Sequence, residues 1–118
     1  MRIVSLACIA GIASLAIACG GSIPPPNDEW AAAQADVGRA EAGGAPNVPD
    51  AKLHLQLAQE DLSKSKALID QDNRRAADLI AVARVEAQLA LSIAKQQLAE
   101  AEAKKAADDL AKAKAGGQ

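Results

Sequence analysis

Few side chains in this sequence are suited to chemistry. His54 is the only histidine, and Asp50 precedes it by four residues, so a helix would place the two on one face as a weak metal-binding pair. Zinc sites need three or four ligands, so a solvated surface pair is the preferred interpretation. Ser63, Ser65 and Ser92 form no triad that can be read from their spacing, and there is no phosphate loop or Cys/His cluster. We therefore predict no enzyme, no catalytic residue, no metal site and no cofactor.

Cys19 is the residue whose position indicates a modification. It follows an apolar run, residues 3–18, and Arg2 supplies a minimal positive region before that run. The run is shorter than the roughly 20 residues that a transmembrane helix needs. A positive start, an apolar stretch and small residues at its end are typical of an export signal.

The end of this run resembles the lipobox of bacterial lipoproteins. The resemblance implies cleavage between Ala18 and Cys19, with acyl chains on the sulfur and on the new amine of Cys19. Two or more chains suffice for a stable membrane anchor. Ala16 stands where the lipobox usually has leucine, and Ala16, Ile17 and Ala18 also fit an ordinary secretory cut. That second route would release a soluble protein with an unpaired thiol in an oxidising space, so the lipoprotein is preferred.

Two neighbouring features refine the expected location. Gly20 follows the cysteine, and the absence of aspartate there implies, through the same resemblance, sorting to the outer membrane, with the chain facing the periplasm. Cys8 lies within the signal and would be removed with it. The mature chain is then expected to contain no internal disulfide.

The composition narrows the class of protein. Thirteen basic and 15 acidic residues give a net charge of −2, which is unfavourable for binding nucleic acid. The chain has one Trp and no Phe or Tyr, so aromatic-lined ligand pockets are not expected. Alanine, leucine and charged residues with high helix propensity supply most of the remainder. These features predict an all-α fold.

Gly and Pro residues divide the chain. A tether with three prolines is expected to be extended, and Asn27 is expected to cap the first helix. Gly43 to Pro46 should end that helix. The predicted organisation is a signal peptide (1–18), the lipidated cysteine and tether (19–27), an alanine-rich helical domain (28–115, with helices at about 28–42, 48–70 and 74–114) and a disordered tail (116–118).

The segment 70–73 contains neither Gly nor Pro, but Asp72 and Asn73 are good N-cap residues. A tight turn is the preferred interpretation, and one continuous helix through residue 73 is the alternative. With a turn there, consecutive helices run antiparallel, and the tether, the start of the first helix and this turn lie at one end. That end is expected to face the membrane.

Apolar residues recur at helical spacing in each predicted helix. In the first helix they are Trp30, Ala33, Val37 and Ala40. In the second they form a seam in which Ser65 is the one polar member: Ala51, Leu55, Ala58, Leu62, Ser65 and Ile69, with Leu53, Leu57 and Leu68 widening the stripe. In the third they are Ala76, Ile80, Ala83, Ala87, Ala90, Ala94 and Leu98, flanked by Leu79, Val82, Val85, Leu89 and Ile93. Trp30 is expected to pack in the bundle, with the membrane interface as its alternative place.

These stripes predict a short antiparallel helical hairpin or three-helix bundle with a long, coiled-coil-like C-terminal helix. The third helix is much longer than the others, so its distal part should project from the bundle. A thinner apolar stripe there is the candidate partner face, for a second copy or an envelope protein: Ala99, Ala103, Ala106, Leu110 and Ala113.

Three features resemble a bacterial envelope family, domain of unknown function 4398: the Ala-Pro pair near the start of the second helix, the Leu55, Ala58 and Leu62 seam, and the alanine repeat from Ala76 to Ala94. Its members are small lipoproteins, or modules that precede an OmpA-like peptidoglycan-binding domain. The resemblance covers roughly residues 28–107 and carries no catalytic residues.

The expected function is that of a non-enzymatic outer-membrane lipoprotein with a structural or partner-binding role. The alternatives are an adaptor subunit of an envelope enzyme or transporter, a secreted soluble helical protein if Cys19 is not lipidated, and, least favoured, a small-ligand or metal binder.

Overall fold

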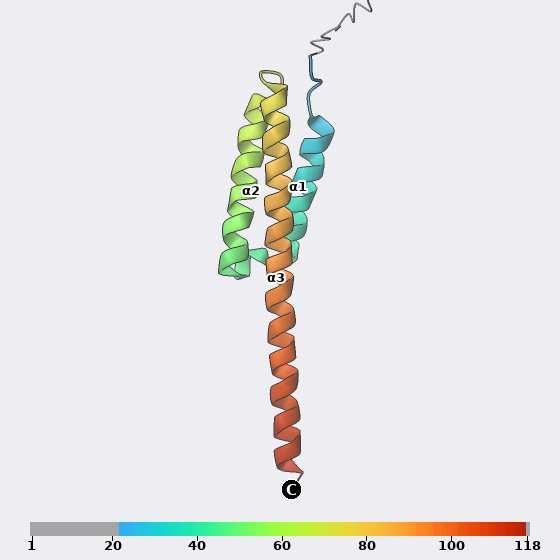
Figure 1. Ribbon diagram of the computed structural model, residues 1–118, viewed down its shortest axis with the longest axis vertical. Coiled ribbons are helices and arrows are strands. Elements are labelled where there is room, and N and C mark those ends of the chain that lie inside the picture. Colours follow the sequence, from blue (N-terminus) through green and yellow to red (C-terminus); the bar gives the residue numbers. More distant parts are fainter. Residues whose placement is uncertain (1–21, 118) are drawn as a thin grey trace, which may run out of the picture.

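The computed structural model describes residues 22–117, and these residues form an all-α fold. The helices are α1 (Asn27–Ala42), α2 (Pro49–Leu68) and α3 (Asn73–Gly116), and a short 3-10 helix, η1 (Ala45–Asn47), joins α1 to α2. α2 runs antiparallel to α1 and α3, and α3 packs against both (Figure 1). The predicted bundle with a long C-terminal helix is therefore confirmed. The expected signal, the cleavage site at Ala18 and the lipid site at Cys19 lie outside the described residues.

α1 begins one residue earlier than predicted, and Asn27 is not its cap. The backbone N–H of Trp30 donates to the carbonyl oxygen of Pro26 at 3.0 Å, which makes Pro26 the N-cap and Asn27 the first helical residue. Pro26 itself is buried. The tether therefore ends at residue 26, and its last residue already packs against the bundle.

The turn between α2 and α3 is confirmed. α2 ends at Leu68: its C-cap, Ile69, has a non-helical ψ of 134°, and Asp70 follows with a φ of 70°, which an α-helix of L-residues cannot continue. The backbone N–H of Asp70 donates to Asn73 Oδ1 at 2.8 Å, and Asp72 Oδ1 accepts from the backbone N–H of Arg75 at 3.1 Å. Asp72 is thus the N-cap of α3, which satisfies one of the donors that a helix start leaves free.

The C-terminal end of α3 differs from the prediction. Gly116 is helical, and Gly117 is the C-cap, so the helix continues into the segment predicted to be a disordered tail. α3 contains 44 residues, which corresponds to a length of about 66 Å.

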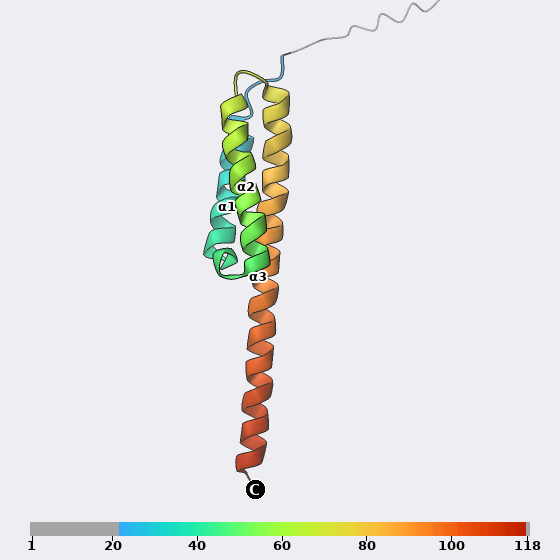
Figure 2. The same ribbon diagram turned by 90° about the vertical axis from the view of Figure 1, so that its left-hand side faces the viewer.

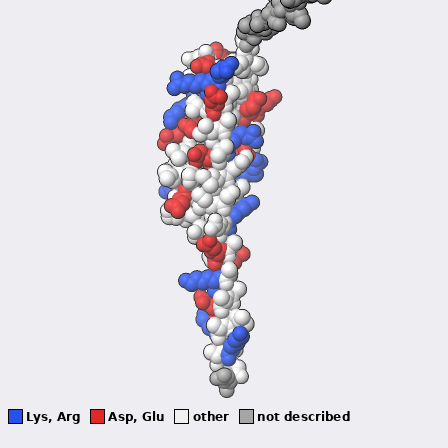
Figure 3. Space-filling model, viewed as in Figure 1, with Lys and Arg blue, Asp and Glu red and all other residues white. Residues whose placement is uncertain are grey.

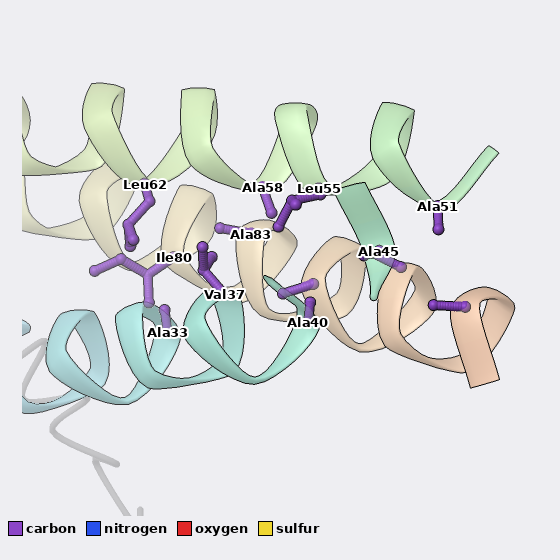
Figure 4. Close-up of a cluster of buried hydrophobic side chains, with 13 residues drawn as sticks. Ala33, Val37, Ala40, Ala45, Ala51, Leu55, Ala58, Leu62, Ile80 and Ala83 are labelled. Atoms are coloured by element: carbon purple, nitrogen blue, oxygen red, sulfur yellow. The ribbon is translucent and has the colours of Figure 1, made fainter. Parts of the chain in front are cut away.

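The core consists mostly of alanine (Figure 4). Larger side chains fill the space between the three helices, and Ile80 is the largest apolar one that is almost fully enclosed, with 1 % of its surface exposed. Ser65 is also enclosed, and its hydroxyl donates to the carbonyl oxygen of Leu62 at 2.7 Å.

Leu53 and Leu57 were expected to widen the α2 stripe, but they are 56 % and 38 % exposed. That prediction was wrong because α1 and α3 both pack against the same side of α2, so these two leucines have no neighbouring helix.

Gly43 and Gly44 end α1 as predicted, each for its own reason. A side chain at residue 43 would displace the end of the Leu91 side chain of α3, which lies against this glycine. Gly44 has a φ of 92°, which is strained for any other residue. The loop therefore brings the end of α1 against α3.

Candidate partner-binding face

The distal part of α3 extends beyond the other helices (Figure 1). Ala94 is the last buried residue of α3, and every residue from 95 to 117 is exposed. Beyond Leu98, which approaches the α1–η1 loop at Gly44, the projecting part is roughly 27 Å long. The five residues of the candidate partner face all lie in it, and all are exposed: Ala99, Ala103, Ala106, Leu110 and Ala113.

α3 also has exposed apolar residues alongside the bundle. Val82, Val85 and Leu89 are 47 %, 64 % and 40 % exposed, although the sequence analysis grouped them with the residues that flank the inner stripe. Of that flanking group, only Leu79 and Ile93 are half-buried. The difference arises because α1 and α2 lie on one side of α3 and leave its opposite side free (Figure 2).

A charged cluster that the sequence analysis missed joins α1 to α3. The carboxylate of Asp36 is only 3 % exposed and accepts hydrogen bonds from Arg39, one turn along the same helix, and from Arg84 Nε at 2.9 Å. A buried carboxylate must be paired to avoid a large desolvation cost. In the sequence, the signal for this pair was the position of Asp36, three residues after Ala33 and four before Ala40, which places it beside the predicted apolar face. The cluster lies within the bundle, so we assign it to stability.

His54 has a different partner from the one that its spacing suggested. Its Nδ1 lies 2.6 Å from Glu86 Oε2 of α3, and both side chains are about one quarter exposed. The prediction of a solvated surface pair with Asp50 was therefore wrong: His54 is half-buried and bridges two helices. The fold, not the local spacing, brings residues 54 and 86 together. Within residues 22–117, no three His, Cys, Asp or Glu side chains are grouped closely enough to hold a metal ion.

Trp30 packs against the bundle. Its Nε1 donates to the carbonyl oxygen of Leu62 at 3.1 Å, and Lys66 Nζ lies 4.0 Å from the centre of the ring. The indole also lines an open groove of about 540 Å³ between α1 and α2, which Val37 and Leu62 make largely apolar. The indole therefore has a hydrogen-bond partner and a packing surface within the bundle itself.

The beginning of the described chain is attached to the turn between α2 and α3. Asn73 Nδ2 donates to the carbonyl oxygen of Ile23 at 2.8 Å. The same side chain uses its oxygen to hold Asp70, so one residue joins the tether to the turn. The tether, the start of α1 and the turn thus share one end, as predicted, and the projecting part of α3 points away from it (Figure 1).

In the part of the chain that the structure describes, no helix combines the length and the hydropathy that crossing a membrane requires. Comparisons with models of protein families, with curated proteins and with solved structures found no match to this chain.

Proposed function

We propose that this chain is a non-enzymatic, lipid-anchored scaffold of the bacterial cell envelope. In this proposal the acylated Cys19 holds the chain at the periplasmic side of the outer membrane, and the distal part of α3 binds a protein partner. The proposal includes no catalytic residue and no cofactor.

The observation that carries the proposal is the position of the uncovered part of α3. The tether enters at one end of the bundle, where Asn73 holds it, and the exposed part of α3 projects from the other end. An attachment at one end and an uncovered helix at the other suit a protein that presents a binding face at a distance from a membrane. An isolated helix with an apolar stripe is marginally stable in water, so a partner would stabilise this segment.

Removing residues 99–118 tests the binding role. The bundle is expected to stay folded, because the deletion starts beyond Ala94, the last buried residue of α3. Its melting temperature, followed by circular dichroism, should stay within a few degrees of that of the full chain. Cross-linking in native membranes should then lose the partner.

The products of that cross-linking separate the two leading roles. Cross-links between copies of this chain indicate a structural oligomer, whereas one foreign protein indicates an adaptor subunit. If the shortened chain is cross-linked to the same species, with the same yield, as the full chain, the binding role of the distal α3 is wrong.

The anchor is tested by mass spectrometry of the mature N-terminus. The expected peptide begins at Cys19 and carries the mass of two acyl chains on a glyceryl thioether and one on the amine. The Cys19→Ser variant should lack this modification. A mature chain with an unmodified Cys19 would contradict the anchor and support the secreted alternative.

A further inference from the structure

The exposed side of α3 carries one continuous heptad pattern. The pattern of the candidate partner face continues toward the N-terminus of α3 with alternating spacings of three and four residues. It therefore runs from the projecting part of α3 along the outer side of the bundle. Every member is exposed, and together they form what we call the outward seam: Val82, Val85, Leu89, Ser92, Gln96, Ala99, Ala103, Ala106, Leu110 and Ala113. The seam covers more than four heptads and about 46 Å of helix. A heptad pattern sustained over three to four repeats indicates a coiled coil.

The outward seam is separate from the seam that packs in the bundle. The buried residues of α3 repeat at four- and three-residue spacings, whereas every member of the outward seam is exposed. Figure 2 shows α1 and α2 on one side of α3, with the opposite side of α3 free. α3 therefore has a second, mostly apolar face, interrupted by Ser92 and Gln96, and the bundle does not cover it. Figure 3 shows acidic and basic side chains interspersed with uncharged surface on the projecting part of α3.

We infer that the outward seam binds the same seam of a second copy, in register, as a parallel two-stranded coiled coil. This inference rests on the proposed partner-binding role of α3 and identifies the partner. Both tethers then emerge at the same end of the dimer, which allows both copies to be attached to one membrane. Small residues in the distal layers let the two helix axes approach to about 8 Å.

The charges beside the seam favour this pairing. The outward seam supplies the a and d positions of a heptad. The a positions are Val82, Leu89, Gln96, Ala103 and Leu110, and the other members are the d positions. In a parallel dimer, the g position, which precedes each a position, faces the e position of the following heptad on the other copy. That e residue lies five residues further along the sequence than the g residue. Lys95 then faces Glu100, and Asp109 faces Lys114, so opposite charges meet in both cases, twice each by symmetry. Each of the other three pairs has at least one uncharged residue, so like charges do not repel each other in any of them. These pairs are Ala81 with Glu86, Gln88 with Ile93, and Glu102 with Ala107.

The polar residues of the seam are also compatible with a buried interface. Ser92 donates its hydroxyl to the carbonyl oxygen of Gln88 at 2.9 Å, so its polar group is satisfied within its own helix. Gln96 Nε2 donates to Glu100 Oε1 at 2.9 Å and keeps its amide oxygen and its second N–H for Gln96 of the other copy. A single polar residue at an a position sets the register of a coiled coil at some cost in stability.

Site-specific disulfide cross-linking of the full chain, expressed in a Gram-negative host, tests the inference. The probe is Ala99→Cys in the seam, and the matched control is Ala101→Cys, another exposed alanine, on the opposite side of the same turn. After mild oxidation of intact cells, the seam variant should form a dimer on a non-reducing gel at least ten times more efficiently than the control. Ala106→Cys, one heptad further along the seam, should behave like Ala99→Cys.

The inference would be overturned by the absence of a dimer from either seam variant, or by a yield equal to that of the control. A dimer that forms only when Gln96→Cys and Ala99→Cys chains are mixed would also overturn it, because it indicates antiparallel pairing. The wild-type chain is run alongside, since a dimer there reports a free Cys19 thiol and so contradicts the anchor, not the seam. In that event the same comparison is made in the Cys19→Ser background.

Charge reversal provides a second readout. Lys95→Glu places two acidic residues together, so it should lower the Ala99→Cys dimer yield severalfold. Adding Glu100→Lys should restore the yield, whereas Lys105→Glu, which lies off the seam, should leave it unchanged. If the double reversal does not restore the yield, the assigned register is wrong.

Discussion

Replacing Ile80 by alanine is expected to lower the free energy of unfolding by about 2–5 kcal/mol, which is the range for removing a large aliphatic side chain from a packed core. Ile80 is 1 % exposed, and its neighbours in the core are mostly alanines. Short side chains cannot move far enough to fill the cavity, so the loss should not be reduced by collapse. The higher helix propensity of alanine recovers only a few tenths of a kcal/mol.

Urea unfolding of residues 22–118, followed by circular dichroism at one fixed low protein concentration, measures this effect. Leu53→Ala on α2 is the matched control, because Leu53 is 56 % exposed and lies outside the outward seam. Its cost should stay within about 0.5 kcal/mol. Equal losses from the two variants would mean that Ile80 is not the centre of the core.

Arg84→Met is expected to cost about 2–3 kcal/mol, because it leaves the carboxylate of Asp36 buried with a partner only on its own helix. Asp36 is 3 % exposed, whereas Arg84 is 43 % exposed. Water can enter where the guanidinium was, so the cost should lie below the 3–5 kcal/mol of a fully enclosed pair. The aliphatic part of methionine retains most of the packing of the arginine stem.

The double variant Asp36→Leu with Arg84→Met separates the charge from the packing. It removes both partners, so it should recover most of the stability that the single variant loses. Arg74→Met, at an exposed position on α3, controls for the loss of a positive charge. If Arg84→Met costs no more than Arg74→Met in the same urea titration, Asp36 does not depend on the contact between α1 and α3.

The inner seams of the helices were predictable from spacing, with one exception. Leu98 has the spacing of the third seam, but it lies beyond Ala94, the last buried residue of α3, and is 53 % exposed. The run from Ala76 to Ala94 lies entirely on one face of a helix, and an apolar face must be covered, so its burial follows from the sequence. The turn before Asn73 was predictable for a similar reason: Asp72 can satisfy the free donors of the next helix. Both inferences use interactions within a few residues of chain.

The exposure of Leu53 and the partner of His54 depended on which side of α2 packs against the other helices. Leu53 has the same hydropathy as the buried Leu55, and only the packing of α1 and α3 on one side of α2 exposes the first and buries the second. His54 similarly had Asp50 as its nearest acidic residue in sequence, but the fold places Glu86 beside it. The spacing of residues within one helix does not specify which side chains of a neighbouring helix will face them.

The sequence by itself determined the all-α class, the inner seams, the stops at Gly43 and Gly44, and the turn before α3. Propensity, capping and helical periodicity are local, so these features need no knowledge of the rest of the chain. Only the tertiary structure decided that Asp36 is buried against Arg84, that His54 faces Glu86, and that Val82, Val85 and Leu89 remain uncovered. Each of these depends on contacts between helices that are distant in sequence, and the spacing of residues within one helix does not specify those contacts.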